Sequence, residues 1–305
     1  METGLTAYLF PGQSLQKPGL GKDLYQQYPQ AREIFDAADG HLGFALSRLC
    51  FEGPEDRLNQ DLNCQLAVYT HSCALSAILE AGGRRPDLVS GYSSGFYAAA
   101  FAAGCFGFVH GLAIVRRAGE LLLDQAAKVE GGMGVVFGLA PDEVEALCRE
   151  TGEVQPAIFN TPRQIIISGR KGAVERTLDK ASAAGALDAY LLPAAAAYHS
   201  TLMTPAAEQL PAAVDPDTVR APNIPLISYT SLEPVKDAQN LVEVMAFQLS
   251  SPVRWVKLIQ GLRPAGVHRA CDVGPGRVIA RSVRWIDRQL EMLAVDSVEG
   301  LEALL

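Results

Sequence analysis

The chain has 305 residues, of which 49% are hydrophobic and 20% are charged, a composition typical of one large folded unit, with or without an insertion. The formal net charge of −8 disfavours nucleic acid as a partner, because duplex binding requires a dominant positive face. No stretch approaches the roughly 20 apolar residues that cross a bilayer, and the first residues lack the basic start of a signal peptide, so we expect a cytoplasmic protein without a membrane partner.

Alternating strands and helices are predicted for the first part of the chain. Residues 6–10 form a short apolar strand that runs into a Pro-Gly-Gln-Ser turn, and loops at strand ends commonly hold ligand sites. Apolar residues recur at near-helical spacing over residues 63–80, and residues 109–126 form a further predicted helix. This alternation is typical of a mainly parallel sheet.

Residues 88–104 combine a short apolar strand, a Gly-x-Ser-x-Gly turn and an Ala-rich helix, which is how a nucleophilic serine is mounted. Gly91 and Gly95 lack the Cβ atoms that would collide at the sharp bend, so the Ser93 hydroxyl is expected to be exposed there. Amides at the start of the helix can stabilise the negative oxygen of a tetrahedral intermediate. The pattern also arises by chance in plain turns, so this segment alone leaves both interpretations open.

The middle of the chain is predicted to follow a β-α-β-β-α-β order, the split ferredoxin-like unit. The strands are expected at residues 133–139, 154–160, 164–168 and 186–192, with helices at 141–150 and 173–184. We therefore predict an α/β fold in which an α/β-hydrolase-like large domain with a mainly parallel sheet comprises residues 1–128 and 195–305. Residues 129–194 form the inserted ferredoxin-like domain.

The last part of the chain returns to the larger unit. An amphipathic helix is predicted at residues 253–262 and a strand at 269–273. The Gly274-Pro-Gly276 turn that follows leads into a last long helix.

A serine hydroxyl is a poor nucleophile unless a base takes its proton, so a histidine must reach it. His71 and His110 lie in predicted helices, where a packing role is the commoner one. His199 differs, because it lies where the inserted unit returns to the larger one.

Seven segments occur in a fixed order along nearly the whole chain. They are Phe10-Pro-Gly-Gln13, Gly91-Tyr-Ser-Ser-Gly95 and residues 132–139, 160–169, 198–203, 248–255 and 272–276. Together they resemble the malonyl-CoA:acyl-carrier-protein transacylases and the related acyltransferase domains of fatty acid and polyketide synthases.

The resemblance implies that Ser93 attacks an acyl thioester while His199 acts as general base and then as general acid toward the leaving thiol. It implies an oxyanion hole formed by the backbone amides of Gln13 and Ser94, and a main-chain carbonyl near Gln248 that orients the histidine. Acyl-CoA is then the donor, and the phosphopantetheine thiol of an acyl carrier protein collects the acyl group from the serine ester.

No cofactor is implied beyond the coenzyme A thioester, which is a substrate. The six cysteines are scattered, without a Cys-x-x-Cys pair or a Cys/His cluster. We therefore expect reduced thiols and neither a disulfide framework nor a metal site.

The chain departs from the family pattern where the acyl group is selected. Relatives that take malonyl groups carry an arginine in the helix after the nucleophile, which pairs with the malonyl carboxylate. An ungapped alignment from Ser93 places Ala118 there, and only a one-residue shift returns Arg117 to that position. Both a malonyl group and a neutral acyl group therefore remain open.

Two tyrosines also change the expected pocket. Tyr92 replaces the histidine usual beside the nucleophile, and Tyr198 stands where malonyl-selective polyketide domains usually carry phenylalanine. Phe96 replaces the usual glutamate after the motif. The pocket wall is thus expected to be more aromatic and less polar, which suits a neutral acyl group.

Arginines recur along the last predicted helix at spacings that place them on one face. They are Arg277, Arg281, Arg284 and Arg288. In an acidic protein this face is a candidate dock for an acidic carrier protein or for coenzyme A phosphates. The alternative is a solvated face that pairs with local carboxylates such as Asp287.

Two other functions use the same residues. A hydrolase that clears acyl groups from carrier proteins would share Ser93 and His199, and the sequence does not report whether water or a thiol resolves the ester. A catalytically idle scaffold is disfavoured, because Gln13, Ser93 and His199 are all present.

Overall fold

Two four-stranded sheets organise the chain in the computed structural model, which describes residues 4–14 and 16–305. Sheet A has the order β2-β1-β7-β8, and all of its neighbouring strands are parallel. Its strands are β1 (Leu5–Phe10), β2 (Leu88–Gly91), β7 (Val267–Val273) and β8 (Glu291–Val295). Sheet B has the order β4-β5-β3-β6, with antiparallel pairs throughout. Its strands are β3 (Gly131–Phe137), β4 (Val154–Thr161), β5 (Gln164–Arg170) and β6 (Asp188–Leu192).

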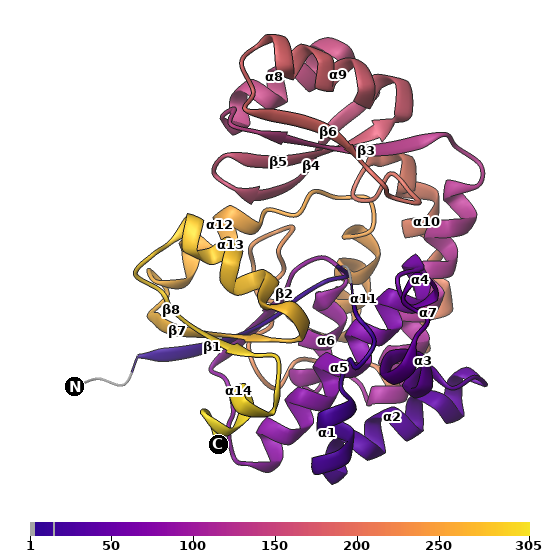
Figure 1. The fold of residues 1–305 in the computed structure, drawn as a ribbon, viewed down its shortest axis with the longest axis vertical. Helices are drawn as coiled ribbons and strands as arrows, with labels where there is room; N and C mark the ends of the chain where they lie inside the picture. The colour runs from indigo at the N-terminus through magenta and orange to yellow at the C-terminus, as the bar shows by residue number, and fades with distance from the viewer. Residues whose placement is uncertain (1–3, 15) are drawn as a thin grey trace.

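Sheet A forms the centre of the larger lobe (Figure 1). Helices pack around it because β1 is apolar and fully buried at Ala7, Leu9 and Phe10, as expected for a parallel sheet covered on both faces. The α-helices of this lobe are α1 (Lys22–Gln27), α2 (Pro29–Leu42), α3 (Leu46–Glu52), α4 (Glu55–Leu58), α5 (Asp61–Ala81), α6 (Gly95–Ala102), α7 (Phe108–Ala126), α10 (Thr204–Gln209), α11 (Ala238–Phe247), α12 (Trp255–Leu262), α13 (Val278–Ile286) and α14 (Val298–Glu302). Short 3₁₀ turns lie at η1 (Thr201–Met203), η2 (Pro211–Ala213), η3 (Pro216–Thr218) and η4 (Pro275–Arg277).

Sheet B and two helices form the smaller lobe. Helices α8 (Pro141–Thr151) and α9 (Lys171–Ala183) cover the face of the sheet away from the larger lobe (Figure 1). Side chains alternate across the sheet, so Val136 and Ile165 pack in a separate small core beneath these helices. Met133 and Ile166 face the other way, toward the larger lobe. The expected α/β fold with a mainly parallel sheet and a ferredoxin-like unit is confirmed.

The turn from β2 into α6 brings backbone segments unusually close together. A Cβ atom on Gly91 would collide with the backbone of Gly95, and one on Gly95 would collide with the carbonyl oxygens of Phe10 and Pro11. Ser93, between these glycines, has φ of 54°, in the left-handed region that costs a non-glycine residue energy. The bend is thus held by tight packing against β1.

The last predicted helix is shorter than expected. Helix α13 begins at Val278, after Gly276 and Arg277 adopt positive φ angles of 86° and 55°, and it ends at Ile286. Asp287 is extended, because the chain turns there to add β8 to the edge of sheet A beside β7. Arg277 and Arg288 therefore lie outside the helix, and the prediction of four arginines along one helical face is wrong. Strand β8 and helix α14 were not predicted.

No helix within residues 4–14 and 16–305 combines the length and the apolar character needed to cross a membrane.

Replacement of Gly95 by alanine is expected to lower the free energy of unfolding by about 2 kcal/mol or more, because the added methyl group overlaps two backbone carbonyls that side-chain motion cannot relieve. Urea denaturation measures the change. Gly40→Ala is the matched control, because a Cβ atom there meets nothing within 4 Å in helix α2. That variant should be neutral or more stable, since alanine favours a helix over glycine. Equal stability of the two variants would contradict this account of the bend.

Candidate active site

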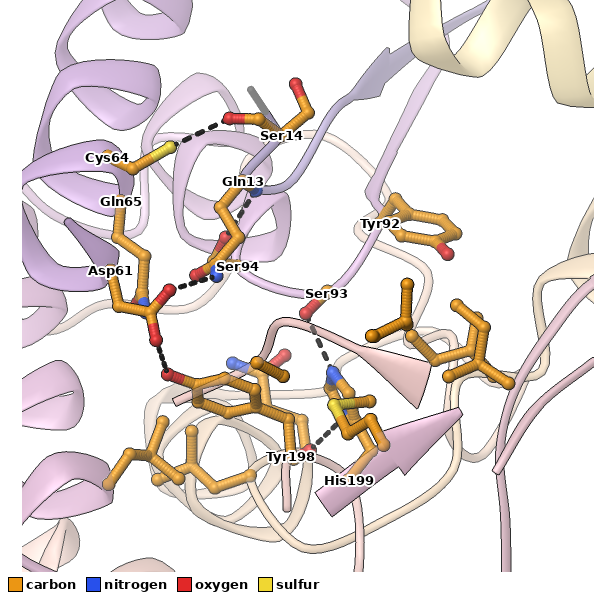
Figure 2. A pocket seen from close by; sticks show the side chains of 18 of the residues that line it. Gln13, Ser14, Asp61, Cys64, Gln65, Tyr92, Ser93, Ser94, Tyr198 and His199 are labelled. Carbon is orange, nitrogen blue, oxygen red and sulfur yellow. Dashed lines mark hydrogen bonds between the residues drawn. The ribbon is translucent and has the colours of Figure 1, made fainter. Parts of the chain in front are cut away.

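Ser93 and His199 meet between the two lobes although 106 positions separate them in the sequence. Ser93 projects from the β2–α6 turn, and His199 follows β6 on the segment that returns to the larger lobe. The Ser93 Oγ lies 2.8 Å from His199 Nε2 (Figure 2). His199 is only 6% exposed, so this hydrogen bond is shielded from competing solvent.

Two backbone carbonyls determine which nitrogen of His199 carries the proton. The Nδ1 atom lies 3.0 Å from the carbonyl oxygen of Gln248 and 3.1 Å from that of Ser251. Carbonyl oxygens only accept, so Nδ1 is the protonated nitrogen and Nε2 is free to accept the Ser93 proton. Burial lowers the pKa of His199 to about 4, against the opposing effect of the two carbonyls. The ring is therefore neutral at pH 7, as a general base must be.

The backbone of His199 is held in an unfavourable conformation by its neighbours. Its φ is 58°, and its amide donates to the Leu249 carbonyl at 3.3 Å. From β4, the Gln155 side chain donates to the His199 carbonyl at 3.4 Å and accepts from the Thr201 amide at 3.2 Å. The family resemblance implied a carbonyl near Gln248, but nothing in the sequence indicated Ser251 or Gln155. Ser251 acts through its backbone carbonyl, and the Gln155 side chain contacts the backbone of the segment that holds His199.

The loop after β1 contacts the start of α6 beside the serine. The Gln13 amide donates to the Ser94 hydroxyl at 3.2 Å, and both residues line the same cavity as Ser93. Ser94 is the residue directly before α6, so the helix N-terminus points at this region with its partial positive charge. The arrangement brings together the two residues expected to stabilise an oxyanion.

A carboxylate that the sequence did not reveal lies on the other side of Gln13. Asp61 is the first residue of α5, and its Oδ1 accepts from Gln13 Nε2 at 3.1 Å. Its Oδ2 accepts from the Tyr198 hydroxyl at 2.7 Å (Figure 2). Burial and the nearby carboxylate raise the pKa of Tyr198 well above its ordinary value, so the phenol stays protonated and donates. A helix was predicted just after this position, but no pattern marked Asp61 as part of the site.

The cavity over Ser93 has a volume of about 440 Å³. One wall is apolar and comes from both lobes: Ala118, Leu122, Met133, Ile158, Ile166 and Leu192. Ala118 is 1% exposed and faces the cavity, whereas Arg117 does not line it. The Arg117 guanidinium lies 3.5 Å from Glu120 and its side chain is 43% exposed. No arginine or lysine is among the described residues that line this cavity, so the register that would bring Arg117 into the pocket is wrong.

Another part of the cavity wall carries aromatic and amide groups. Tyr92 lines the cavity and packs its ring edge-on against Trp255, with centroids 5.2 Å apart. Tyr97 and Tyr229 also line it, together with the Gln248 side chain. The buried Tyr229 hydroxyl has no hydrogen-bond partner among the described residues. A buried polar atom without a partner costs about 1–3 kcal/mol, so this wall favours a bound group that can form hydrogen bonds.

The four arginines singled out in the sequence lie away from the cavity, and none of them lines it. All four are exposed. Arg277 pairs with Asp296 at 3.0 Å, while Asp287 pairs with Arg263 and not with any of the four. Arg281 and Arg284 remain on α13, next to Trp285, whose side chain is 70% exposed.

The same architecture occurs in proteins that share about a third of the sequence. Residues 7–289 match the family of the acyl transferase domain. The chain is 36% identical to a malonyl CoA-acyl carrier protein transacylase of Bacillus subtilis over 300 residues, which is 97% of this chain and 95% of that protein. It is 32% identical to the Escherichia coli protein of the same name over 303 residues, 98% of each chain.

Solved structures agree with this similarity. The malonyl CoA-acyl carrier protein transacylase of Coxiella burnetii superimposes with a TM-score of 0.93 at 32% identity, covering 98% of this chain and 96% of that one. A malonyl-transacylase solved in complex with a type II polyketide synthase acyl-carrier protein gives a TM-score of 0.94 at 31% identity, covering 99% of both chains. With its serine and histidine in hydrogen-bond contact at the bottom of the shared fold's cavity, the chain is an enzyme of the acyl transferase family.

Proposed function

We propose that this enzyme moves a neutral acyl group from coenzyme A to the phosphopantetheine thiol of an acyl carrier protein, through an ester on Ser93. The hydrogen bond of 2.8 Å between Ser93 and a neutral His199 supports the serine chemistry. The observation that carries the choice of acyl group is the absence of arginine and lysine from the described lining of the cavity. The names of the relatives, which are malonyl transacylases, support the donor and acceptor classes.

The first half-reaction forms the ester. His199 Nε2 takes the proton of Ser93 as its oxygen attacks the thioester carbonyl. The backbone amide of Ser94 stabilises the resulting oxyanion, and so does that of Gln13 once it exchanges its hydrogen bond to the Ser94 hydroxyl for one to the substrate oxygen. Each such donor contributes roughly 3–4 kcal/mol in serine enzymes. Collapse of the intermediate breaks the carbon–sulfur bond, and the imidazolium returns the proton to the departing coenzyme A thiolate.

The second half-reaction reverses these roles. The carrier thiol gives its proton to His199 and attacks the ester carbonyl, and Ser93 leaves with that proton. The carbonyls of Gln248 and Ser251 accept from the Nδ1 hydrogen throughout, so they stabilise the imidazolium that forms in each step. No acidic side chain is required on the ring.

Neutral selectivity follows from the cost of burying charge. A carboxylate taken from water into a cavity without a cationic partner loses several kcal/mol of solvation. Ala118 supplies only a methyl group where an arginine would pair with it, and Arg117 is held at the surface by Glu120. An uncharged chain instead gains free energy from the apolar wall that includes Leu122 and Met133.

A panel of acyl-CoAs tests the proposed donor class. Acetyl-CoA and butyryl-CoA are expected to add their acyl mass to the intact protein at least tenfold faster than malonyl-CoA, since a buried unpaired charge is disfavoured. Intact-protein mass spectrometry measures the label, and Ser93→Ala is the control that should remain unlabelled. Preferential malonyl labelling would refute neutral selectivity. Free coenzyme A produced by the wild-type protein without label or carrier would support the hydrolase alternative.

The pH dependence of ester formation tests the state of His199. Burial disfavours the imidazolium, so the ring loses its proton at a lower pH than an exposed histidine and remains a base down to about pH 4. The rate of labelling by a neutral acyl-CoA should therefore decrease as the pH is lowered, with an apparent pKa of about 4. An acid limb near 6.5, with folding verified by circular dichroism at each pH, would show that the resting histidine is not desolvated as described.

Charge reversal on α13 tests the carrier dock. Arg281→Glu together with Arg284→Glu should raise the KM for an acidic carrier protein by about tenfold at low salt and leave ester formation from acyl-CoA unchanged, because neither residue reaches the cavity. Arg32→Glu with Arg48→Glu is the matched control, since it changes the net charge equally at exposed positions on α2 and α3. If both double variants raise the KM for the carrier protein equally, the change in net charge explains the effect, and α13 is not the docking surface.

A further inference from the structure

Asp61 is the only residue with a formal negative charge among the described residues that line the cavity over Ser93. No ion pair involving it occurs in the described part of the chain, where the arginine and lysine side chains that form ion pairs contact other carboxylates. Its two hydrogen bonds come from uncharged donors, the side-chain amide of Gln13 and the hydroxyl of Tyr198. The charge of Asp61 is therefore stabilised by hydrogen bonds but not neutralised by a cation.

The position of this charge matters because it borders the space that a serine ester must occupy. Gln13 and Tyr198 connect Asp61 to both halves of the site. The backbone amide of Gln13, whose side chain donates to Asp61, contacts the hydroxyl of Ser94 beside the nucleophile. Tyr198 directly precedes the general base His199. Figure 2 shows Asp61 and Gln65 on the α5 side of the cavity, with Tyr198 reaching up from the other side. An acyl group on Ser93 shares this enclosed volume with the carboxylate.

We infer that Asp61 determines the charge selectivity of the enzyme by repelling acyl groups that end in a carboxylate. This inference rests on the proposed function and deepens it. Two like charges in a partly buried cavity repel more strongly than in water, because the effective dielectric constant is lower. Rejection of a competitor by an unpaired like charge is a common basis of specificity. Ala118 removes the attraction for a carboxylate, and Asp61 adds an active repulsion.

A purely structural role of Asp61 would have a different effect on the kinetics. If Asp61 served only to hold Tyr198 and Gln13 in place, its loss would slow the reaction of all acyl donors alike. A repulsive role changes the ratio between donors, because only the carboxylated donor feels the charge. The ratio of kcat/KM for malonyl-CoA to kcat/KM for butyryl-CoA is therefore the informative quantity.

Asp61→Asn removes the charge at nearly constant volume and is expected to raise that ratio by about tenfold or more. Asp61→Glu retains the charge and should leave the ratio within about twofold of the wild type. Tyr198→Phe removes one hydrogen bond but not the charge, so it should lower both kcat/KM values together. Should Asp61→Asn fail to fold, Asp61→Ser supplies the same loss of charge.

The result that overturns the inference is an unchanged ratio in every folded variant that lacks the charge. It is also overturned if Tyr198→Phe raises the ratio as much as Asp61→Asn, because the hydrogen bond and not the charge would then be responsible. The proposed function is judged separately, by the ratio in the wild-type enzyme. A wild type that prefers malonyl-CoA refutes neutral selectivity, yet a further rise in Asp61→Asn still establishes repulsion by Asp61.

Discussion

The hydrogen bond between Ser93 and His199 is the interaction on which the rest of this structure depends. It joins a strained turn of the larger lobe to the segment that returns from the smaller one, and both residues have positive φ angles. Such backbone strain persists only where the surroundings impose it. Gly95 packs against the backbone of β1, and Gln155 reaches from β4 to the His199 backbone. Each lobe thus contributes to holding one partner.

The carbonyls of Gln248 and Ser251 perform the task that a carboxylate performs in many serine enzymes. They orient the imidazole and define its tautomer without adding a full negative charge next to it. Because the ring is also buried, nothing nearby raises its proton affinity strongly, and it stays neutral at pH 7. Asp61, the single carboxylate among the described residues that line the cavity, instead accepts from the Tyr198 hydroxyl and the Gln13 side chain.

Local patterns predicted much of the architecture. The apolar strand before Gly91, the glycines around Ser93 and the β-α-β-β-α-β order of the middle part each reflect short-range sterics or periodicity that a sequence displays directly. The last helix was predicted too long, because its end depends on β8 pairing with β7, a contact that periodicity does not encode. Asp61 was missed for a similar reason: an acidic residue at a helix start is common, and its partners lie 48 and 137 positions away.

The sequence by itself indicated Ser93 as the nucleophile, His199 as the base and the family likeness, since these rest on residues whose type and local spacing carry the chemistry. Only the tertiary structure decided which side chains face the cavity over Ser93. Ala118 and Arg117 are neighbours on α7, and one position along a helix rotates a side chain by about 100°. The packing of α7 against the lobe therefore selects the methyl group for the cavity and leaves the guanidinium paired with Glu120 at the surface.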